Sequence, residues 1–335
     1  MRGIYGGVPA QLLERGSLKD YGVNAIFMGS GGVNEERVRL LREQGARVFA
    51  EFNTMHEADY VKQHPDAAPV GVDGEVCPPA DEWQGVCPTH AEYRRYKMDD
   101  FRRVLRDYEV DGMWLDYHHS HADWERADPI LPDTCFCDRC LAQFRSDTGT
   151  KLPDKPTIEL SALLLNEQKA KWVQWRCDVF TDWVREFRAI IDETRPEALL
   201  GTYHCPWSDT DNDGALREKL AIDLKAQAPH MDVFSIMPYH ARFGHHDDPA
   251  WIARQTRWLG DYLGIEGKPG ERHQIWPIVQ LSDWGEPVPA SQVREVLEQG
   301  TESPVTGVMV FNWGGLQKQM ENVEEMGKFY RAIAG

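Results

Sequence analysis

Residues 111–119 read DGMWLDYHH, and this stretch decides the expected fold. Its apolar run is followed abruptly by polar residues, which is typical of a buried strand that reaches the edge of a sheet. The same rhythm, a short β-rich run followed by an amphipathic helix pattern, occurs eight times along the chain. The other expected strands lie at residues 3–8, 24–30, 46–53, 198–205, 232–240, 274–282 and 307–313.

Helix patterns separate these runs. Residues 35–45, EERVRLLREQG, carry apolar side chains at helical spacing and end at a glycine, and a long apolar stripe over 171–196 ends at a proline. Regular alternation of strand and helix predicts a parallel sheet. Eight such units in 335 residues predict an α/β fold, a single (β/α)8 TIM barrel spanning 1–335. We expect extended loops after strands three and four, with an insertion at about 120–170.

Charge and hydropathy exclude several classes of partner. Thirty-seven basic and 54 acidic residues give a net charge of −17, which argues against nucleic acid or an anionic membrane as a partner. The sequence has no apolar stretch of 18 residues, and the N-terminus lacks the apolar region of a signal peptide. A cytoplasmic location is therefore expected.

Polar side chains gather where the expected strands end. Barrel enzymes carry out their chemistry at the carboxyl ends of the strands. In the fourth strand, alternation predicts that Asp116 and His118 face the mouth, whereas Tyr117 packs under the helices. By position, the candidate substrate-binding residues are Glu51, Asn53, His118, His119, Tyr203, His204, Tyr239, His240, Trp284, Asn312 and Trp313.

Carboxylates and tryptophans at this end favour carbohydrate chemistry. Trp83, Trp124, Trp207, Trp284 and Trp313 fall in or next to the expected loops, where indoles can stack on pyranose rings. Glycoside hydrolysis needs two carboxyl groups, one that protonates the leaving oxygen and one that attacks or activates water.

The sequence offers one clear carboxylate for this reaction and two choices for the other. Asp116 follows strand four, and Asp283 or Glu286 lies across the mouth after strand seven. We therefore expect a glycosidase that uses Asp116 with one of these two, retaining rather than inverting.

Three cysteines lie within six residues in DTCFCDRCLAQF, residues 133–144. Neighbouring thiols at this spacing do not suit a disulfide, and a tetrahedral zinc site needs four ligands. Cys87, in the loop after strand three, is the expected fourth, with Cys77 as the alternative. We expect structural zinc on Cys87, Cys135, Cys137 and Cys140, which would tie two loops together.

The region from Trp83 to Gly149 resembles the zinc-bearing region of glycoside hydrolase family 42 β-galactosidases and of related hypothetical glycosyl hydrolases. The matching motifs are a Cys-Pro segment at 87–90 and the cysteine cluster running from Cys135 to Phe144. The resemblance implies a barrel, a carbohydrate substrate, zinc on the same four cysteines, and a possible homo-oligomer.

The chain departs from that family at the end of strand four. The galactosidases carry an Asn-Glu pair there, whereas this chain has Asp116-Tyr117-His118-His119. The run DGMWLDY is instead similar to the nucleophile segment of some retaining α-glycosidases. That similarity implies that Asp116 is the nucleophile and that a group on strand six or seven is the acid.

Two other hypotheses remain open. A metal-assisted hydrolase would bind a catalytic ion through Asp116, His118, His119, His121, His204 and His240. A barrel that keeps the aromatic residues but lacks one carboxylate would bind carbohydrate without catalysis.

Overall fold

The computed structural model describes residues 1–334 and places a strand in every region where the sequence predicts one. The seventh predicted strand is divided in two by Trp276 and Pro277. The strands are β1 (Arg2–Tyr5), β2 (Ala25–Gly29), β3 (Arg47–Asn53), β4 (Gly112–Asp116), β5 (Leu199–His204), β6 (Val233–Ile236), β7 (Gln274–Ile275), β8 (Ile278–Gln280) and β9 (Val308–Phe311).

These strands form one curled sheet in the order β7-β6-β5-β4-β3-β2-β1-β9-β8, and every pairing between them is parallel over the described residues. The outermost strands, β7 and β8, are separated in the chain by only two residues. The Trp276 N–H donates to the Phe234 carbonyl of β6, and the Pro277 carbonyl accepts from Met309 N–H of β9, each at 3.0 Å. This curled α/β arrangement is consistent with the predicted TIM-like fold.

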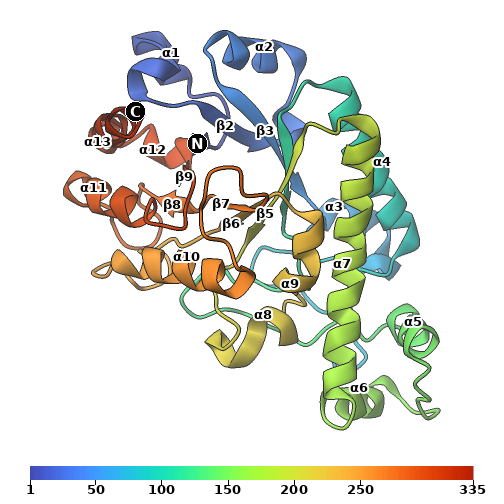
Figure 1. Ribbon diagram of the computed structural model, residues 1–335. Coiled ribbons are helices and arrows are strands. Elements are labelled where there is room, and N and C mark those ends of the chain that lie inside the picture. The colour runs from blue at the N-terminus through green and yellow to red at the C-terminus, as the bar shows by residue number, and fades with distance from the viewer. Residues whose placement is uncertain (335) are drawn as a thin grey trace.

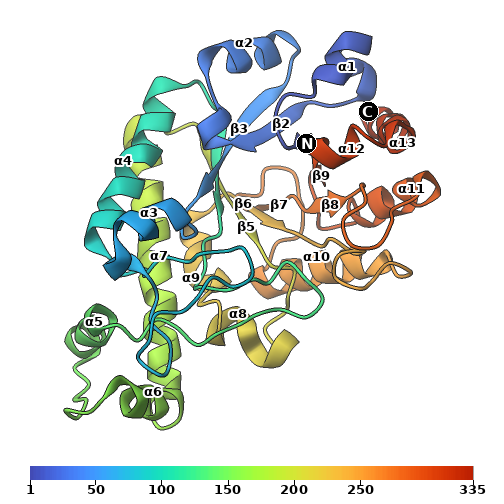
Figure 2. The same cartoon turned by 180° about the vertical axis from the view of Figure 1, so that it is seen from behind.

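Helices surround the sheet, and Figures 1 and 2 show them as an outer layer. The α-helices are α1 (Ala10–Arg15), α2 (Glu35–Glu43), α3 (Ala58–Gln63), α4 (Ala91–Asp107), α5 (Asp138–Thr148), α6 (Thr157–Leu165), α7 (Lys169–Thr194), α8 (Ala215–Glu218), α9 (Leu224–Gln227), α10 (Ala250–Leu263), α11 (Ala290–Gln299), α12 (Trp313–Leu316) and α13 (Met320–Ala332). Short 3-10 helices are η1 (Leu18–Tyr21), η2 (Ser30–Gly32), η3 (Pro65–Ala67), η4 (Asp211–Gly214) and η5 (Ala228–His230). None of the helices within 1–334 combines the length and apolar character that crossing a bilayer requires.

The long helix α7 shows which end of the sheet carries the extended loops. It follows the segment that contains α5 and α6, and both views place these two helices next to the N-terminal part of α7. A helix that returns from β4 to β5 begins near the carboxyl ends of the strands, because the strands are parallel. The segment between β4 and α7 therefore lies at the carboxyl end of the sheet.

Aromatic side chains fill the interior of the curled sheet. The Trp114 indole stacks on Trp276 at 5.6 Å and packs edge-on against Phe49 at 4.8 Å, and its Nε1 donates to Ser235 Oγ at 3.0 Å. Space for it comes from Gly201 on β5, where a Cβ would lie 2.2 Å from the indole. Trp114 therefore points into the interior of the curled sheet, and Asp116 follows it on the same face at the carboxyl end of β4.

Candidate active site

A pocket of about 250 Å³ lies at the carboxyl ends of the strands, directly beyond Trp114. Aromatic side chains make up most of its wall, and two carboxylates open into it. The lining residues are Tyr5, Trp83, Asp116, Tyr117, Glu125, Tyr203, Met237, Tyr239, Ile278, Trp284, Phe311 and Asn312.

The end of β4 fixes Asp116 at the bottom of this pocket. Its carbonyl accepts from the N–H and the hydroxyl of Thr54, both at 2.9 Å, and its Oδ1 accepts from Tyr117 N–H at 2.8 Å. Only 7% of Asp116 is exposed. Burial, followed by the nearby carboxylates of Glu51 and Glu125, raises the pKa of Asp116 well above its ordinary value.

Glu51, on the neighbouring strand β3, forms a carboxyl pair with Asp116. The two carboxyl groups are joined by a hydrogen bond, and Glu51 Oε2 also accepts from the Tyr5 hydroxyl at 2.5 Å. Burial raises the pKa of Glu51, although hydrogen bonds from Tyr5 and Asp116 oppose that rise. Two carboxylates in contact cannot both ionise without a large repulsion, so the pair retains one proton between them.

Glu125 is the second carboxylate on the pocket wall, and it was not among the residues predicted from sequence. It lies in the loop after β4, directly after Trp124. Burial and the Asp123 carboxylate raise the pKa of Glu125 to about 7, with Arg242 acting in the opposite direction. Arg242 also holds the backbone, since its Nε donates to the Glu125 carbonyl at 2.7 Å. The position of Glu125 depends on the path of the loop after β4, and no strand or helix pattern in the sequence predicts that path.

The two carboxylates predicted after strand seven take other positions. Asp283 is exposed, and its Oδ1 accepts from the Val288 N–H at 2.8 Å and from Gln319 Nε2 at 3.0 Å. Glu286 is also exposed. Neither belongs to the pocket lining, so the structure does not bring either of them together with Asp116.

Alternation along β4 ends one residue earlier than the sequence suggests. Tyr117 has a left-handed backbone with φ of 50°, so the side chains after it change face. Tyr117 consequently lines the pocket, with its ring stacked on His56 at 4.7 Å. His118 turns away, and its Nε2 contacts the Phe180 carbonyl of α7 at 2.9 Å. The predicted faces of Tyr117 and His118 are thus reversed.

Three strand ends share this arrangement. In the Tyr-His pairs at 117–118, 203–204 and 239–240, the tyrosine lines the pocket and the histidine does not. His204 Nδ1 contacts the Cys205 carbonyl at 3.0 Å, and His240 Nε2 contacts Gln292 Oε1 at 3.1 Å. Tyr203 and Tyr239 therefore belong to the pocket lining, whereas His204 and His240 lie behind them.

The histidines that follow His118 also bond to protein groups. His119 accepts from Trp124 Nε1 at 2.9 Å, and its Nδ1 contacts the Ser120 carbonyl at 2.7 Å. His121 accepts from Gly85 N–H at 3.0 Å. Burial lowers the pKa of both His118 and His119 to about 4, so both are neutral. Within residues 1–334 the group of side chains close enough to hold a metal is made of cysteines, and these histidines are not part of it.

The remaining predicted residues divide between the pocket and its supports. Trp284 and Asn312 line the pocket, and the Arg242 guanidinium lies 4.7 Å from the Trp284 ring. Asn53 instead fixes its own loop, because its Nδ2 donates to the His56 carbonyl at 2.6 Å. Trp313 is buried and donates to Gln11 Oε1 at 3.2 Å.

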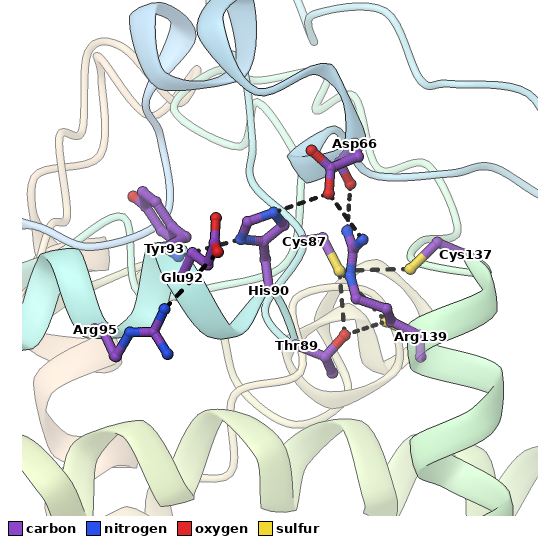
Figure 3. Close-up of polar contacts among 10 residues, drawn as sticks. Asp66, Cys87, Thr89, His90, Glu92, Tyr93, Arg95, Cys137 and Arg139 are labelled. Carbon is purple, nitrogen blue, oxygen red and sulfur yellow. Dashed lines mark hydrogen bonds and ion pairs between the residues drawn. The ribbon is translucent and has the colours of Figure 1, made fainter.

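The four predicted cysteines come together away from this pocket. The sulfur atoms of Cys87, Cys135, Cys137 and Cys140 all lie within 4.8 Å of one another. Figure 3 marks the contact between Cys87 and Cys137. Cys87 Sγ is 3.5 Å from Cys137 Sγ and 3.6 Å from Cys140 Sγ. Zinc–sulfur bonds of about 2.3 Å in a tetrahedron place the sulfurs about 3.8 Å apart. The cluster therefore fits a four-coordinate metal ion, and Cys77 is not part of it.

Charged and polar groups around the cluster hold its two loops together. Arg139, on α5, contacts both the carboxylate and the carbonyl of Asp66, and the same carboxylate contacts His90 Nε2 at 3.1 Å (Figure 3). The Val70 N–H donates to Cys135 Sγ at 3.3 Å. Residues 66–90 of the loop after β3 are thus fixed against residues 135–140 of the loop after β4.

No protein family model matches the sequence, and no curated protein matches it. Solved structures do share its fold. The glycoside hydrolase domain of PgaB (BpsB) from Bordetella bronchiseptica superposes with a TM-score of 0.73 at 12% identity, over 98% of each chain. A β-galactosidase from Halorubrum lacusprofundi has a TM-score of 0.69 at 13% identity, covering 99% of this chain and 58% of its own. Gan42B, a GH42 β-galactosidase from G. stearothermophilus, has a TM-score of 0.67 at 13% identity. The chain spans little more than half the length of these galactosidases.

Proposed function

We propose that this chain is a glycoside hydrolase built as a single (β/α)8 barrel domain, with its active site in the pocket at the end of β4. The observation that carries the proposal is that Asp116 and Glu125 open into one aromatic-lined pocket at the carboxyl ends of the strands. The shared fold with glycoside hydrolases supports the same class of reaction. Extended loops after β3 and β4 form the side of the pocket that carries Trp83 and Glu125.

The pocket wall suits a sugar ring. Tyr5, Trp83, Trp284 and Phe311 are partly exposed and offer aromatic faces to the apolar C–H side of a pyranose, with the buried Tyr203 and Tyr239 behind them. Asn312 at the same wall offers its amide nitrogen to ring hydroxyls, while its Oδ1 accepts from the Gly315 N–H at 2.8 Å. The substrate class that follows is a carbohydrate.

Glu125 acts as the general acid and base. A pKa of about 7 leaves a large fraction of Glu125 protonated near neutral pH, and that is the condition for efficient proton transfer in both directions. Glu125 protonates the glycosidic oxygen while an Asp116 oxygen attacks the anomeric carbon, and the bond to the leaving sugar breaks. Water then gives a proton to Glu125 and attacks the same carbon, which frees Asp116 and retains the anomeric configuration.

Glu51 is a positioning residue for Asp116. In the free site the proton that the pair holds rests on Asp116, because the contact between the two carboxyl groups raises the pKa of Asp116 and lowers that of Glu51. That proton must pass to Glu51 before Asp116 can attack as a carboxylate, and the Tyr117 N–H donates to Asp116 Oδ1. The Tyr5 hydroxyl bonds the other side of Glu51 and keeps its carboxyl in place. Asp116 thus has one defined orientation toward the pocket.

The four-cysteine cluster is proposed to bind zinc with a structural role. Zinc bound by four thiolates leaves no open coordination position, so it supplies cross-linking and no chemistry. Cys87 belongs to the loop after β3, while Cys135, Cys137 and Cys140 belong to the segment after β4. The cluster would therefore stabilise the two loops that carry Trp83 and Glu125.

The test is hydrolysis of 4-nitrophenyl α- and β-glycosides of common hexoses, pentoses and N-acetylhexosamines by the wild type and by Asp116→Asn. We expect the wild type to hydrolyse at least one glycoside and the variant to lose about a thousandfold in kcat. NMR of the first anomer released should show retained configuration. Asp283→Asn is the matched control, because this exposed carboxylate follows strand seven and lies outside the pocket. Equal activity of wild type and Asp116→Asn would refute the assignment.

A further inference from the structure

A second pocket lies beside the candidate active site and has no part in the chemistry described above. Its volume is about 260 Å³, close to that of the first. Its wall includes Trp207, Phe243, His245, Trp251, Asn212 and Gln255. We call this hollow the second pocket.

The two pockets are adjacent. Glu125 lines the first pocket and Arg126 lines the second, so consecutive residues of one loop separate them. Consecutive Cα atoms are about 3.8 Å apart. Aromatic rings continue from one to the other, since Phe243 of the second pocket stacks toward Tyr239 of the first with centroids 6.4 Å apart.

The aromatic wall of the second pocket is held in place before any ligand arrives. Trp251 stacks on His245 with centroids 4.2 Å apart and planes at 15°. With the Gln255 amide turned so that both of its polar atoms have partners, Trp251 Nε1 donates to the amide oxygen at 2.8 Å and the amide nitrogen donates to the Pro206 carbonyl at 2.9 Å. Trp207 packs edge-on against Trp124 at 6.3 Å. A rigid aromatic wall loses little conformational entropy on binding, which favours affinity.

Polar groups complete the second pocket. Asn212 is exposed at its edge, with a left-handed backbone of φ 49°. Asparagine and aspartate adopt this conformation more readily than other non-glycine residues, and Asp213 does so too with φ of 58°, so a left-handed turn sets Asn212 at the edge of the pocket. The Arg126 guanidinium contacts Asp123 at 3.2 Å, so its charge is compensated by a carboxylate. Asp211 also lines the pocket, and its Oδ2 accepts from the Ser208 N–H at 2.7 Å. The wall thus combines aromatic faces with amide and carboxylate groups that can hydrogen-bond hydroxyls, which suits a pyranose unit.

We propose that the second pocket is a sugar subsite, and that the substrate is an oligosaccharide or polysaccharide whose neighbouring units occupy both pockets. Each pocket is smaller than the roughly 300–1,000 Å³ of a complete ligand site, which suits one unit per pocket. This inference rests on the proposed glycosidase function and specifies its substrate class.

The experiment measures kcat/KM for 4-nitrophenyl glycosides that carry one, two or three units of the cello-, chito-, manno- and galacto-oligosaccharide series. Calorimetry with the unlabelled oligosaccharides measures binding separately. Ala127→Trp places a large side chain at an exposed position that lines the second pocket. Asn212→Gly removes the amide while keeping a residue that tolerates the left-handed backbone. Ala162→Trp, at an exposed position on α6, is the control for the added bulk.

For the series that is hydrolysed, we expect kcat/KM to rise at least tenfold from one unit to three. Ala127→Trp should abolish that rise, Asn212→Gly should reduce it severalfold, and Ala162→Trp should leave it intact. Hydrolysis with no dependence on chain length would overturn the second subsite and leave the proposed function standing. Binding that grows with length and is lost in Ala127→Trp, without hydrolysis, would support the subsite and overturn the enzyme. Absence of both hydrolysis and binding would overturn both.

Discussion

The two sides of the pocket mouth carry acidic residues in different physical states. On the side of β3 and β4, Glu51, Asp116 and Glu125 are turned inward, and burial raises the pKa of each. On the side of the seventh strand, Asp283 and Glu286 are exposed to solvent. Both sides have carboxylates within a few residues of a strand end, so closeness to a strand end alone does not make a catalytic group.

Burial beside another carboxyl group distinguishes the two sides. A solvated carboxylate is ionised near neutral pH and is a poor proton donor, whereas a buried one can hold a proton there. Asp283 accepts hydrogen bonds from Val288 N–H and Gln319, which is how a carboxylate shapes a loop. The two sides therefore serve different purposes, chemistry on one and loop structure on the other.

The largest expected effect on kcat comes from replacing one carboxylate on each side by its amide. Glu125→Gln cannot donate or accept the proton that the leaving group needs, so kcat should fall by about 100- to 10,000-fold. Glu286→Gln, on the exposed side, should change kcat by less than about twofold. Both are measured with the 4-nitrophenyl glycoside that the wild type hydrolyses best.

Leaving-group dependence makes the test specific for an acid. A 2,4-dinitrophenyl leaving group departs with little protonation, so Glu125→Gln should lose far less activity on a 2,4-dinitrophenyl glycoside than on the 4-nitrophenyl one. A loss of equal size on both substrates would mean that Glu125 does not act as the acid. A large loss in Glu286→Gln would show that the exposed side takes part after all.

The strands could be predicted from the sequence because the pattern of apolar residues that indicates a strand is local. The run GMWL is apolar, β-rich and bounded by polar residues, and β4 forms over residues 112–116 of the predicted 111–119. The long helix predicted at 171–196 is α7, Lys169–Thr194. The break in the seventh strand was not predicted, although Pro277 cannot donate a ladder hydrogen bond and so marks its place.

The candidate site could be predicted from the sequence only in part, because the direction of its side chains depends on single backbone angles and on the paths of loops. The left-handed backbone of Tyr117 changes which of the following side chains face the pocket. A glycine at this position would have indicated such a conformation, but the sequence has none there. The four cysteines were recognised because metal ligands must have a particular type and spacing. Glu125 was missed because only the folded loop turns it inward.

The cysteine cluster joins the loops after β3 and β4, which belong to the side with the buried carboxylates. Removing the cluster therefore gives a second test of the comparison. Cys140→Ser removes one of four thiolates, and we expect loss of tightly bound zinc and a fall of about 3 kcal/mol or more in the free energy of unfolding. Activity should fall as well, because the loop carrying Glu125 follows β4 within the fastened segment.

The control uses a cysteine in the same region but outside the cluster. Cys77→Ser changes a buried thiol that is not part of the four, and it should retain zinc and lose about 1 kcal/mol or less. Zinc content by atomic emission and urea unfolding of both variants decide the point. Equal zinc content in Cys140→Ser and the wild type would mean that the cluster does not fasten this side through a metal.

The smallest expected effect concerns how the free energy of unfolding depends on pH. It compares the carboxylates of the two sides without any substrate. The pKa of Glu125 is raised to about 7 by burial, above its value in the unfolded chain, so its contribution to stability is fully present at low pH and is lost as pH rises through 7. Glu125→Gln has no charge to bury, so its stability relative to wild type should increase on the order of 2 kcal/mol between pH 5 and pH 8. Glu286→Gln, exposed on the other side, should show no such pH-dependent gain. Urea unfolding of the three proteins at both pH values measures the difference, and a gain that is the same at pH 5 and pH 8 would mean that Glu125 is not buried as a proton-holding group.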